Sequence, residues 1–421
     1  MSFLAVLEQC HNHPTLGGEH PAGETLVPLY LHLPDNLAGL SLRRLPPPPP
    51  IKRLTTRRTS SSSSAAAAAA AGSQKFKPLS SYLTRSNSSD QLDNNPFFNE
   101  QAYQPPWDQA AQDRDARQPI GFLRPAVLKA LIQDNQHMNR IHSQACWKLF
   151  YPPDQGQETG ASLPARVSFE DWINQAEDRI ETRQEHLDRL VRGWKEIGLF
   201  ADQLSGWRNE VYSVYGPKDD SLQLPGANLA FRIERAAVGL FGFLSFGVHL
   251  TAYIKKDGQY LFWIPRRSAT KATWPSKLDN TVAGGITSGE SGLDTIIREC
   301  FEEASLDEET VRSRIRPTGL ISYTHRSPEG WIQPEIQYTY DLELPAENTI
   351  VPKPNDGESE AFRLMTFDEL AEALRADSFK PNSAAVLVDF FVRHGLLSET
   401  NEPNYVALST LVKQPVFLPL P

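Results

Sequence analysis

Three glutamates in the C-terminal half of the chain recur at a spacing that could bring them onto one metal ion. Glu299, Glu302 and Glu303 stand at positions i, i+3 and i+4, so a helix would carry them on one face. Like charges on one face repel one another, and a bound divalent cation would reverse that repulsion. Hard oxygen ligands suit Mg²⁺ or Mn²⁺, usually bound together with substrate phosphates. The pattern therefore predicts phosphate chemistry at a metal site, and its alternative is a solvated acidic helix face.

The residues around these glutamates predict a turn followed by a helix. Gly284, Gly285 and Gly289 mark the turn. Ser291 is the expected N-cap of the helix, and Asp294 is the expected acidic partner of a capping box. Apolar residues then recur at helical spacing and predict a single buried face, made of Leu293, Ile296, Ile297, Cys300 and Phe301.

The full spacing matches a known signature. Gly284, five residues, Glu290, seven residues and then the run 298–306 resemble the Nudix box, GX5EX7REUXEEXGU. Two positions differ from that pattern, since Ser305 replaces a glycine and Cys300 fills an aliphatic position. A serine there must accept the backbone angle of the glycine, at some cost if φ is positive. Neither difference removes a carboxylate.

The resemblance implies a fold, a reaction and a role for each residue of the box. The fold would be an α/β/α sandwich, a mixed sheet with a catalytic loop and helix, preceded by a small α+β domain. The enzyme would hydrolyse a diphosphate by attack of water on phosphorus, with Mg²⁺ or Mn²⁺ as cofactor. Glu299, Glu302 and Glu303 would be the metal ligands. Glu299 would also be a candidate base, oriented by Arg298, and Glu290 would pin the loop to the helix.

The resemblance leaves the catalytic base open. In some members of the family the base lies on a distant loop, so Glu358 and Glu360 are further candidates. The alternative for these two is an exposed acidic turn. The backbone of Gly284 and Gly285 is expected to approach the metal or the phosphate closely.

Cations and aromatic rings before and after the box are candidates for binding the substrate. Four basic residues precede the box and predict an electropositive lip, with a solvated basic loop as the alternative: Arg266, Arg267, Lys271 and Lys277. Five aromatic residues could stack on a ring, although aromatic residues in strands are usually core: Trp263, Trp274, Tyr323, Trp331 and Tyr338. His249 and His325 are expected to be structural.

Residues outside the box resemble one particular group of Nudix proteins. The stretches 233–249, 265–271 and 278–286 resemble the thiamine-pyrophosphokinase-related Nudix proteins of fungi and plants, which carry an N-terminal domain of unknown function. That group implies hydrolysis of thiamine diphosphate, preferentially its damaged oxo and oxy analogues, to the monophosphate. The chain has no Walker-type phosphate loop, so a kinase is not expected.

Three alternatives remain open at this point. A nucleoside-diphosphate cleanup hydrolase, acting for example on oxidised dGDP, would use the same box. A catalytically weak Nudix module that only binds its ligand is the non-enzymatic alternative. The run from Trp274 to Thr281 also resembles the isopentenyl-diphosphate isomerases, but Val282 and Ala283 stand where those enzymes place an essential cysteine.

Composition sets the expected class and compartment. The chain has 421 residues, a net charge of −9 and three cysteines, which argue against a nucleic-acid-coating role and against a disulfide framework. No apolar run is long enough to cross a membrane, and the N-terminus lacks the basic region of a targeting peptide. We therefore expect a small-molecule diphosphate as partner, neither nucleic acid nor membrane, and a cytosolic or nuclear location. The oligomeric state stays open.

Composition also divides the chain. We expect residues 1–40 to begin an N-terminal α+β domain that residues 118–230 complete. Runs of proline, serine and alanine predict that 41–117 is a disordered insertion. Residues 231–398 are expected to form the Nudix domain, and 399–421 a loose tail.

Overall fold

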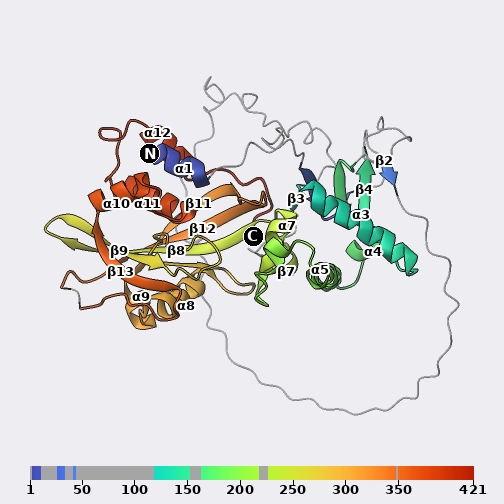
Figure 1. Ribbon diagram of the computed structural model, residues 1–421, viewed down its shortest axis with the longest axis horizontal. Coiled ribbons are helices and arrows are strands. Elements are labelled where there is room, and N and C mark those ends of the chain that lie inside the picture. The colour runs from blue at the N-terminus through green and yellow to red at the C-terminus, as the bar shows by residue number, and fades with distance from the viewer. Residues whose placement is uncertain are drawn as a thin grey trace, which may run out of the picture.

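The computed structural model describes residues 2–10, 26–33, 41–43, 118–151, 163–217, 226–347 and 349–421. These residues form an elongated molecule with two units, a C-terminal unit around a long sheet and an N-terminal unit around a shorter one (Figure 1). The insertion predicted for 41–117 lies outside the described residues, apart from its first three.

A mixed sheet forms the centre of the C-terminal unit. Its strand order is β11-β12-β8-β9-β13, with β10 paired to β8. The strands are β8 (Ser245–Lys256), β9 (Gln259–Arg267), β10 (Val282–Gly285), β11 (Ile315–Arg326), β12 (Ile332–Glu343) and β13 (Ser359–Thr366). β12 and β8 run parallel and the other pairs are antiparallel. β10 is short. It ends at the two glycines of the box, Gly284 and Gly285, which pair with β8.

Helices cover both faces of this sheet. On one face lie α8 (Gly292–Ala304) and α9 (Glu308–Arg314), and on the other lie α10 (Phe367–Arg375) and α11 (Pro381–Arg393) (Figure 1). Each face has its own buried apolar cluster, one with Val248 and Ile296, the other with Phe262 and Phe390. The expected α/β/α sandwich is confirmed.

The first and the last helix among the described residues pack on the α11 side of the sheet, and the residues at both ends of the chain correct two expected boundaries. α1 (Phe3–Cys10) contacts α11 and α12 (Tyr405–Leu411), with Phe3 and Leu7 buried. It therefore belongs to the C-terminal unit and not, as predicted, to the N-terminal domain. The predicted loose tail is also ordered, because Leu408 and Leu418 bury their side chains.

The N-terminal unit has a five-stranded sheet. Its order is β2-β4-β5-β1-β3, and only β1 and β5 run parallel. The strands are β1 (Val27–Tyr30), β2 (Ser41–Arg43), β3 (Gly121–Leu123), β4 (Trp147–Tyr151) and β5 (Arg166–Phe169). Since β2 pairs with β4, the sheet includes the first three residues that the sequence assigned to the insertion.

The helices of the N-terminal unit follow its strands. α3 (Pro125–Arg140) begins at its proline, and Leu131 and Met138 lie on its buried face. Residues 166–169 form β5, and two helices follow, α4 (Asp171–Asn174) and α5 (Arg179–Glu196), the second capped by Asp178.

A hairpin joins the two units. After α6 (Ala201–Leu204), β6 (Val211–Tyr215) pairs with β7 (Leu229–Glu234), and η2 (Arg235–Ala237) and α7 (Val238–Phe241) follow. Phe231, Phe241 and Phe243 belong to the apolar core of the N-terminal unit. The boundary expected at residue 230 is therefore wrong, because this core continues as far as Phe243.

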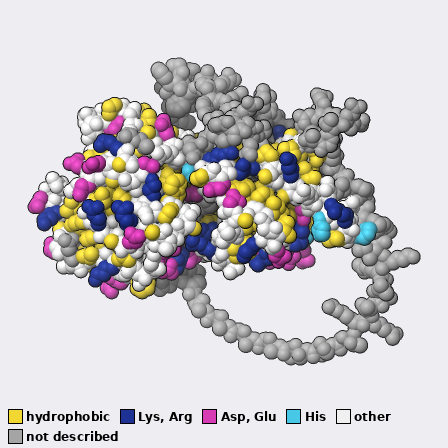
Figure 2. Space-filling view, viewed as in Figure 1, with side chains coloured by type: hydrophobic (Ala, Val, Ile, Leu, Met, Phe, Trp, Pro, Cys, Tyr) yellow, Lys and Arg dark blue, Asp and Glu magenta, His cyan; other side chains and the backbone are white. Residues whose placement is uncertain are grey.

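The surface shows no simple pattern of charge on the face in view. Basic and acidic side chains are interspersed over both units (Figure 2). Among the described residues, none of the helices combines the length and the apolar character that crossing a membrane would require.

Candidate active site

The catalytic helix of the box begins with the cap that its sequence predicts. The Ser291 hydroxyl accepts a hydrogen bond from the backbone N–H of Asp294 at 3.1 Å and donates one to the Asp294 carboxylate at 2.7 Å. The apolar face is narrower than expected. Ile296 and Cys300 are buried, whereas Leu293 in the first turn and Phe301 at the edge of the stripe are exposed.

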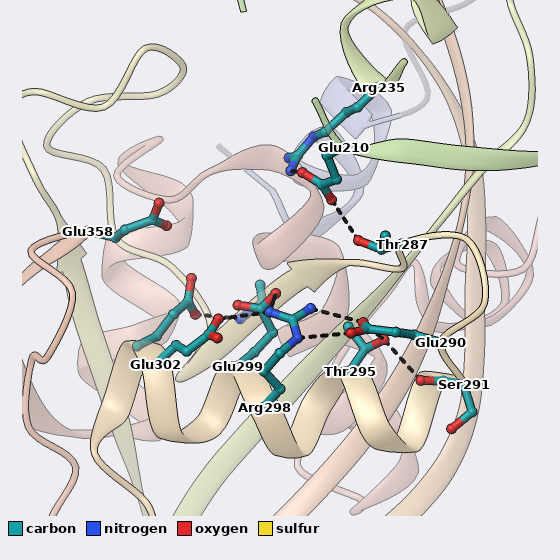
Figure 3. Close-up of polar contacts among 12 residues, drawn as sticks. Glu210, Arg235, Thr287, Glu290, Ser291, Thr295, Arg298, Glu299, Glu302 and Glu358 are labelled. Atoms are coloured by element: carbon teal, nitrogen blue, oxygen red, sulfur yellow. Dashed lines mark hydrogen bonds and ion pairs between the residues drawn. The ribbon is translucent and has the colours of Figure 1, made fainter. Parts of the chain in front are cut away.

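Arg298 connects the carboxylates of the box. Its Nη1 donates to Glu299 at 3.0 Å and to Glu302 at 2.8 Å, and its Nε and Nη2 donate to Glu290 at 3.2 and 3.0 Å (Figure 3). Glu290 also accepts from the Thr295 hydroxyl at 2.9 Å. Glu290 therefore bonds the loop to the helix, and Arg298 bonds Glu299. One guanidinium serves three carboxylates.

Glu299 is held in a space that only glycine leaves open. A Cβ on Gly284 would lie 2.4 Å from the Glu299 carboxyl carbon, so a side chain there would displace the carboxylate. The carboxylate has a side-chain exposure of 15%. Burial raises the pKa of Glu299 to about 7, the Arg298 charge opposes that shift, and the Glu302 charge adds to it.

Glu303 lies deeper against the sheet. Its Oε2 accepts a hydrogen bond from the backbone N–H of Ala283 at 3.0 Å. Burial raises the pKa of Glu303 well above its usual value, and the charge of Glu299 adds to the shift. Two neighbouring carboxylates are thus held where their charged forms are disfavoured.

As they stand, these side chains do not form a closed metal cage. Among the residues that the structure describes, no three Asp, Glu, His or Cys side chains converge closely enough to hold a metal ion. The reason is visible in the hydrogen bonds, since Arg298 takes oxygens of both Glu299 and Glu302. The donor set still fits a hard cation, because Glu302 is half exposed on its helix and can rotate away from Arg298.

One of the two remote glutamates faces this group. Glu358, at the start of β13, projects toward Glu299 and Glu302 (Figure 3), and its charge contributes to the raised pKa values of Glu299 and Glu303. Lys271 pairs with Glu358. Glu360 instead accepts a hydrogen bond from the backbone of Ala269 at 3.2 Å.

The predicted basic lip is mostly engaged in holding its own loop. Arg267 pairs with Asp279 at 2.6 Å and donates to two backbone carbonyls, and Arg266 donates to the carbonyl of Ser276. Lys277 pairs with Asp377 at 3.1 Å. Of the four, only Lys271 contacts a side chain that faces the box, through its pair with Glu358.

The aromatic candidates are largely structural. Trp263 and Tyr338 pack in the core beneath α8, and Trp331 packs in the core of the N-terminal unit. Trp274 and Tyr323 line a cavity of about 40 Å³ with Cys10, His325 and Lys380, on the opposite side of the sheet from α8. That volume holds roughly one water molecule and not a ring.

The two histidines behave as expected. Burial lowers the pKa of His249 to about 4, and its Nδ1 lies 2.6 Å from the Asn280 carbonyl oxygen. Burial also lowers the pKa of His325. Both rings are therefore neutral at pH 7 and serve packing rather than charge.

Sequence reasoning assigned no role in the site to the β6–β7 hairpin, which lies against the box. Glu210 accepts a hydrogen bond from the Thr287 hydroxyl at 3.1 Å and pairs with Arg235 at 2.9 Å (Figure 3). A Cβ on Gly285 would lie 1.8 Å from the Tyr212 hydroxyl, so the second glycine makes room for this ring. No fixed spacing connects these residues to the box, so no motif could have indicated them.

Comparison with known proteins gives one family. The model of the NUDIX domain matches residues 247–387. An uncharacterized protein of Saccharomyces cerevisiae, YJR142W, is 35% identical over 303 residues, which cover 69% of this chain and 79% of the yeast protein. Two proteins of Arabidopsis thaliana, Nudix hydrolase 20 and Nudix hydrolase 24, both named as chloroplastic, are each 34% identical over 56% of this chain. This chain spans 59% and 60% of their lengths.

Proposed function

The chain belongs to the Nudix family of hydrolases, and on that premise we propose that it is a metal-dependent hydrolase of thiamine diphosphate and its damaged oxo and oxy analogues. The products would be the thiamine monophosphate and phosphate. The proposal has two parts with different support. The reaction class rests on the box and its geometry, and the substrate rests on the sequence resemblance outside the box.

The surplus of negative charge in the box carries the reaction class. Glu290, Glu299 and Glu302 share one guanidinium, and within the described part of the chain the hydrogen bond to Glu303 comes from a backbone N–H alone. Burying carboxylates without cations costs several kcal/mol for each charge, so a fold retains such a group only where something else stabilises it. A divalent cation carrying a substrate phosphate would supply that stabilisation.

Glu299, Glu302 and Glu303 would hold the metal. When bound, the metal would neutralise charge on the diphosphate and lower the barrier to attack by water. The protein supplies the rest of the site. Arg298 orients Glu299, and the tie between Arg298 and Glu290 keeps the glycine loop next to the helix.

Two carboxylates are placed to take the proton of the attacking water. Glu299 has a pKa near 7, which suits a general base at neutral pH. Burial raises the pKa of Glu358, but Lys271, Arg208 and Arg267 together lower it below its usual value, so Glu358 is ionised at that pH. A base must be charged before the reaction, and this favours Glu358 in the absence of a neighbouring cation.

The test is a substrate panel with a matched pair of variants. Purified protein with Mg²⁺ is given thiamine diphosphate, its oxo and oxy analogues, ADP-ribose and oxidised dGDP, and phosphate release is measured. We expect release from the thiamine compounds, reduced roughly a thousandfold in Glu303→Gln. Glu309→Gln, an exposed glutamate on α9, is the control and should match the wild type.

Each other outcome has a clear meaning. Release from nucleotides alone would retain the hydrolase and reject thiamine. An isomerase is not favoured, since Asn280 and Thr281 are buried and hydrogen-bonded within the fold. If no compound is hydrolysed but binding is intact, the protein is a binding module and not an enzyme.

A further inference from the structure

The β6–β7 hairpin belongs to the N-terminal unit in sequence but forms one wall of the Nudix site. The backbone N–H of Ser288 donates to the carbonyl of Val211 at 2.9 Å. The hydroxyls of Ser213 and Ser288 lie 2.7 Å apart, and Arg232 Nε donates to the Ser288 hydroxyl at 3.1 Å. The loop of the box is therefore fixed to the hairpin by backbone and side-chain bonds together.

Arg235 stands at the end of this hairpin in a fixed orientation. Its Nη1 donates to Glu210 Oε2 at 2.9 Å, and its backbone N–H donates to the Glu210 carbonyl at 2.8 Å. The guanidinium lies over the Tyr212 ring, 5.6 Å from its centroid. The other Glu210 oxygen accepts from Thr287 of the box loop. These contacts hold the cation at one place relative to the box.

The guanidinium faces the carboxylates of α8. In Figure 3 it lies across the site from α8, on the same side as Glu210, with Glu358 at the other edge. Burial lowers the pKa of Arg235, but Tyr212, Glu210 and Glu299 together raise it by more. Glu299 is thus within electrostatic reach, although Arg298 already pairs with it.

The donors of Arg235 are not all used inside the protein. Among the contacts between described residues, only its Nη1 makes a side-chain hydrogen bond, and the side chain has an exposure of 38%. A guanidinium carries five N–H donors in a planar fork that matches two oxygens of a phosphate. Arg235 can therefore keep its bond to Glu210 and still bind an anion.

A second arginine of the same unit lies nearby. Lys271 is the largest influence that lowers the pKa of Glu358, and the charges of Arg208 and Arg267 add to it. Arg208 is exposed, and its backbone N–H is bonded to Glu234 at 3.1 Å. The charge of Arg208 thus acts, like that of Arg267, on a carboxylate that faces the box.

We propose that Arg235 is a substrate-binding residue that the N-terminal unit supplies to the Nudix site, and that it binds a phosphate oxygen of the diphosphate opposite the carboxylates. The ligand class rests on the proposed function. The diphosphate then lies between a negative surface that holds its cation and a positive side chain that holds its oxygen. The N-terminal unit would on this account be part of the active site and not a separate module.

The experiment compares three full-length variants. Arg235→Ala removes the guanidinium, Arg235→Lys keeps the charge without the fork, and Arg192→Ala removes an exposed arginine of α5 in the same unit. We expect Arg235→Ala to raise KM by roughly tenfold to a hundredfold, with a smaller change in kcat. Arg235→Lys should recover part of the loss, and added guanidinium ions should restore Arg235→Ala. Arg192→Ala should equal the wild type.

A binding measurement separates this inference from the proposed function. Affinity for inorganic pyrophosphate, with Mg²⁺ present, should fall in Arg235→Ala by the same factor as KM rises, while the melting temperature stays near that of Arg192→Ala. Unchanged KM and unchanged pyrophosphate affinity would overturn the inference, as would a loss that appears only as a lower melting temperature. If the wild type hydrolyses no diphosphate, the proposed function fails, and pyrophosphate affinity alone decides the role of Arg235.

Discussion

Two groups of carboxylates lie on opposite sides of the C-terminal sheet, and the fold treats them in opposite ways. On the α11 side, Asp341 is paired with Arg393 at 2.8 Å and lies 2.7 Å from His394, and Asp279 is paired with Arg267 at 2.6 Å. On the α8 side, three carboxylates of the box share Arg298 alone. One group is balanced by cations and the other is not.

The pKa values follow this difference. Burial by itself raises the pKa of Asp279, but Lys380 and Arg267 lower it to about 2. Burial raises the pKa of Glu299 to about 7, and Arg298 does not overcome it. Asp279 thus has enough cations within the chain to stay charged, whereas Glu299 does not. We interpret this difference between the two residues as the mark of the functional side of the sheet.

The largest expected effect on stability is on the balanced side. Asp279→Asn leaves Arg267 and Lys380 without their carboxylate, and we expect it to lower the free energy of unfolding by about 3–5 kcal/mol. Urea denaturation followed by circular dichroism measures this loss. Glu303→Gln is the matched change on the α8 side, and in metal-free protein it should leave stability equal or higher. Equal losses in the two variants would mean that both carboxylates are structural.

The pH dependence of stability should have opposite signs for the two groups. Glu299 has a raised pKa, so its favourable contribution to stability is complete below about pH 4.5 and is lost as the pH rises to about 7. The loss is on the order of 3 kcal/mol. Asp279 has a lowered pKa, so its contribution is complete above about pH 4 and is lost as the pH falls toward 2.

Metal-free protein in a chelator is the sample for this measurement. The free energy of unfolding of the wild type minus that of Glu299→Gln should fall steadily between pH 4.5 and 7. Glu360→Gln, at a carboxylate that accepts a hydrogen bond from the Ala269 backbone, is the control for adding an amide near the site. Parallel profiles of wild type and Glu299→Gln would show that Glu299 is charged in the fold at all these pH values.

Bound Mg²⁺ should balance the charge of the carboxylates on the α8 side and so stabilise the folded protein. At pH 7 and a concentration near a hundred times its Kd, Mg²⁺ should stabilise the wild type by about 2.7 kcal/mol, because it binds the folded chain alone. We expect Glu303→Gln and Glu299→Gln to lose most of this gain, and Asp279→Asn to keep it. The shift in melting temperature on adding Mg²⁺ gives the answer. A gain of the same size in all variants would place the metal elsewhere.

Within the candidate active site, the acidic residues of the box and the cations opposite them also differ in how well the sequence predicts them. The contacts among Glu290, Arg298 and Glu299 were expected from the resemblance to the Nudix box, whose spacing the chain matches. The mixed sheet with helices on both faces was likewise expected from that resemblance. Such features are carried by the motif itself.

The cationic side depends on contacts between distant residues, and there the prediction fell short. Arg266, Arg267 and Lys277 are near the box in sequence, but each is taken by its own loop or by Asp377. Arg235 reaches the site only because β6 and β7 pack on the box loop. The packing of α1 on α11 has the same origin, since an amphipathic helix does not specify which apolar surface it will cover.

The smallest effect concerns the one position where the box departs from its glycine. Ser305 ends α8 with φ 54° and ψ 28°, in the left-handed region that the sequence analysis identified as the cost of a serine there. Ser305→Gly relieves this strain. It also raises the conformational entropy of the unfolded chain and removes the hydrogen bond to the Lys353 carbonyl, and both of these changes oppose the gain. We expect a net gain of about 0.5 kcal/mol, measured by urea denaturation, with no change in KM. Ser305→Ala keeps the strain and loses the hydrogen bond, so it should be less stable than the wild type. If alanine and glycine were equally stable, backbone strain would not be what Ser305 costs, and the difference from the family pattern would have no energetic consequence at the end of this helix.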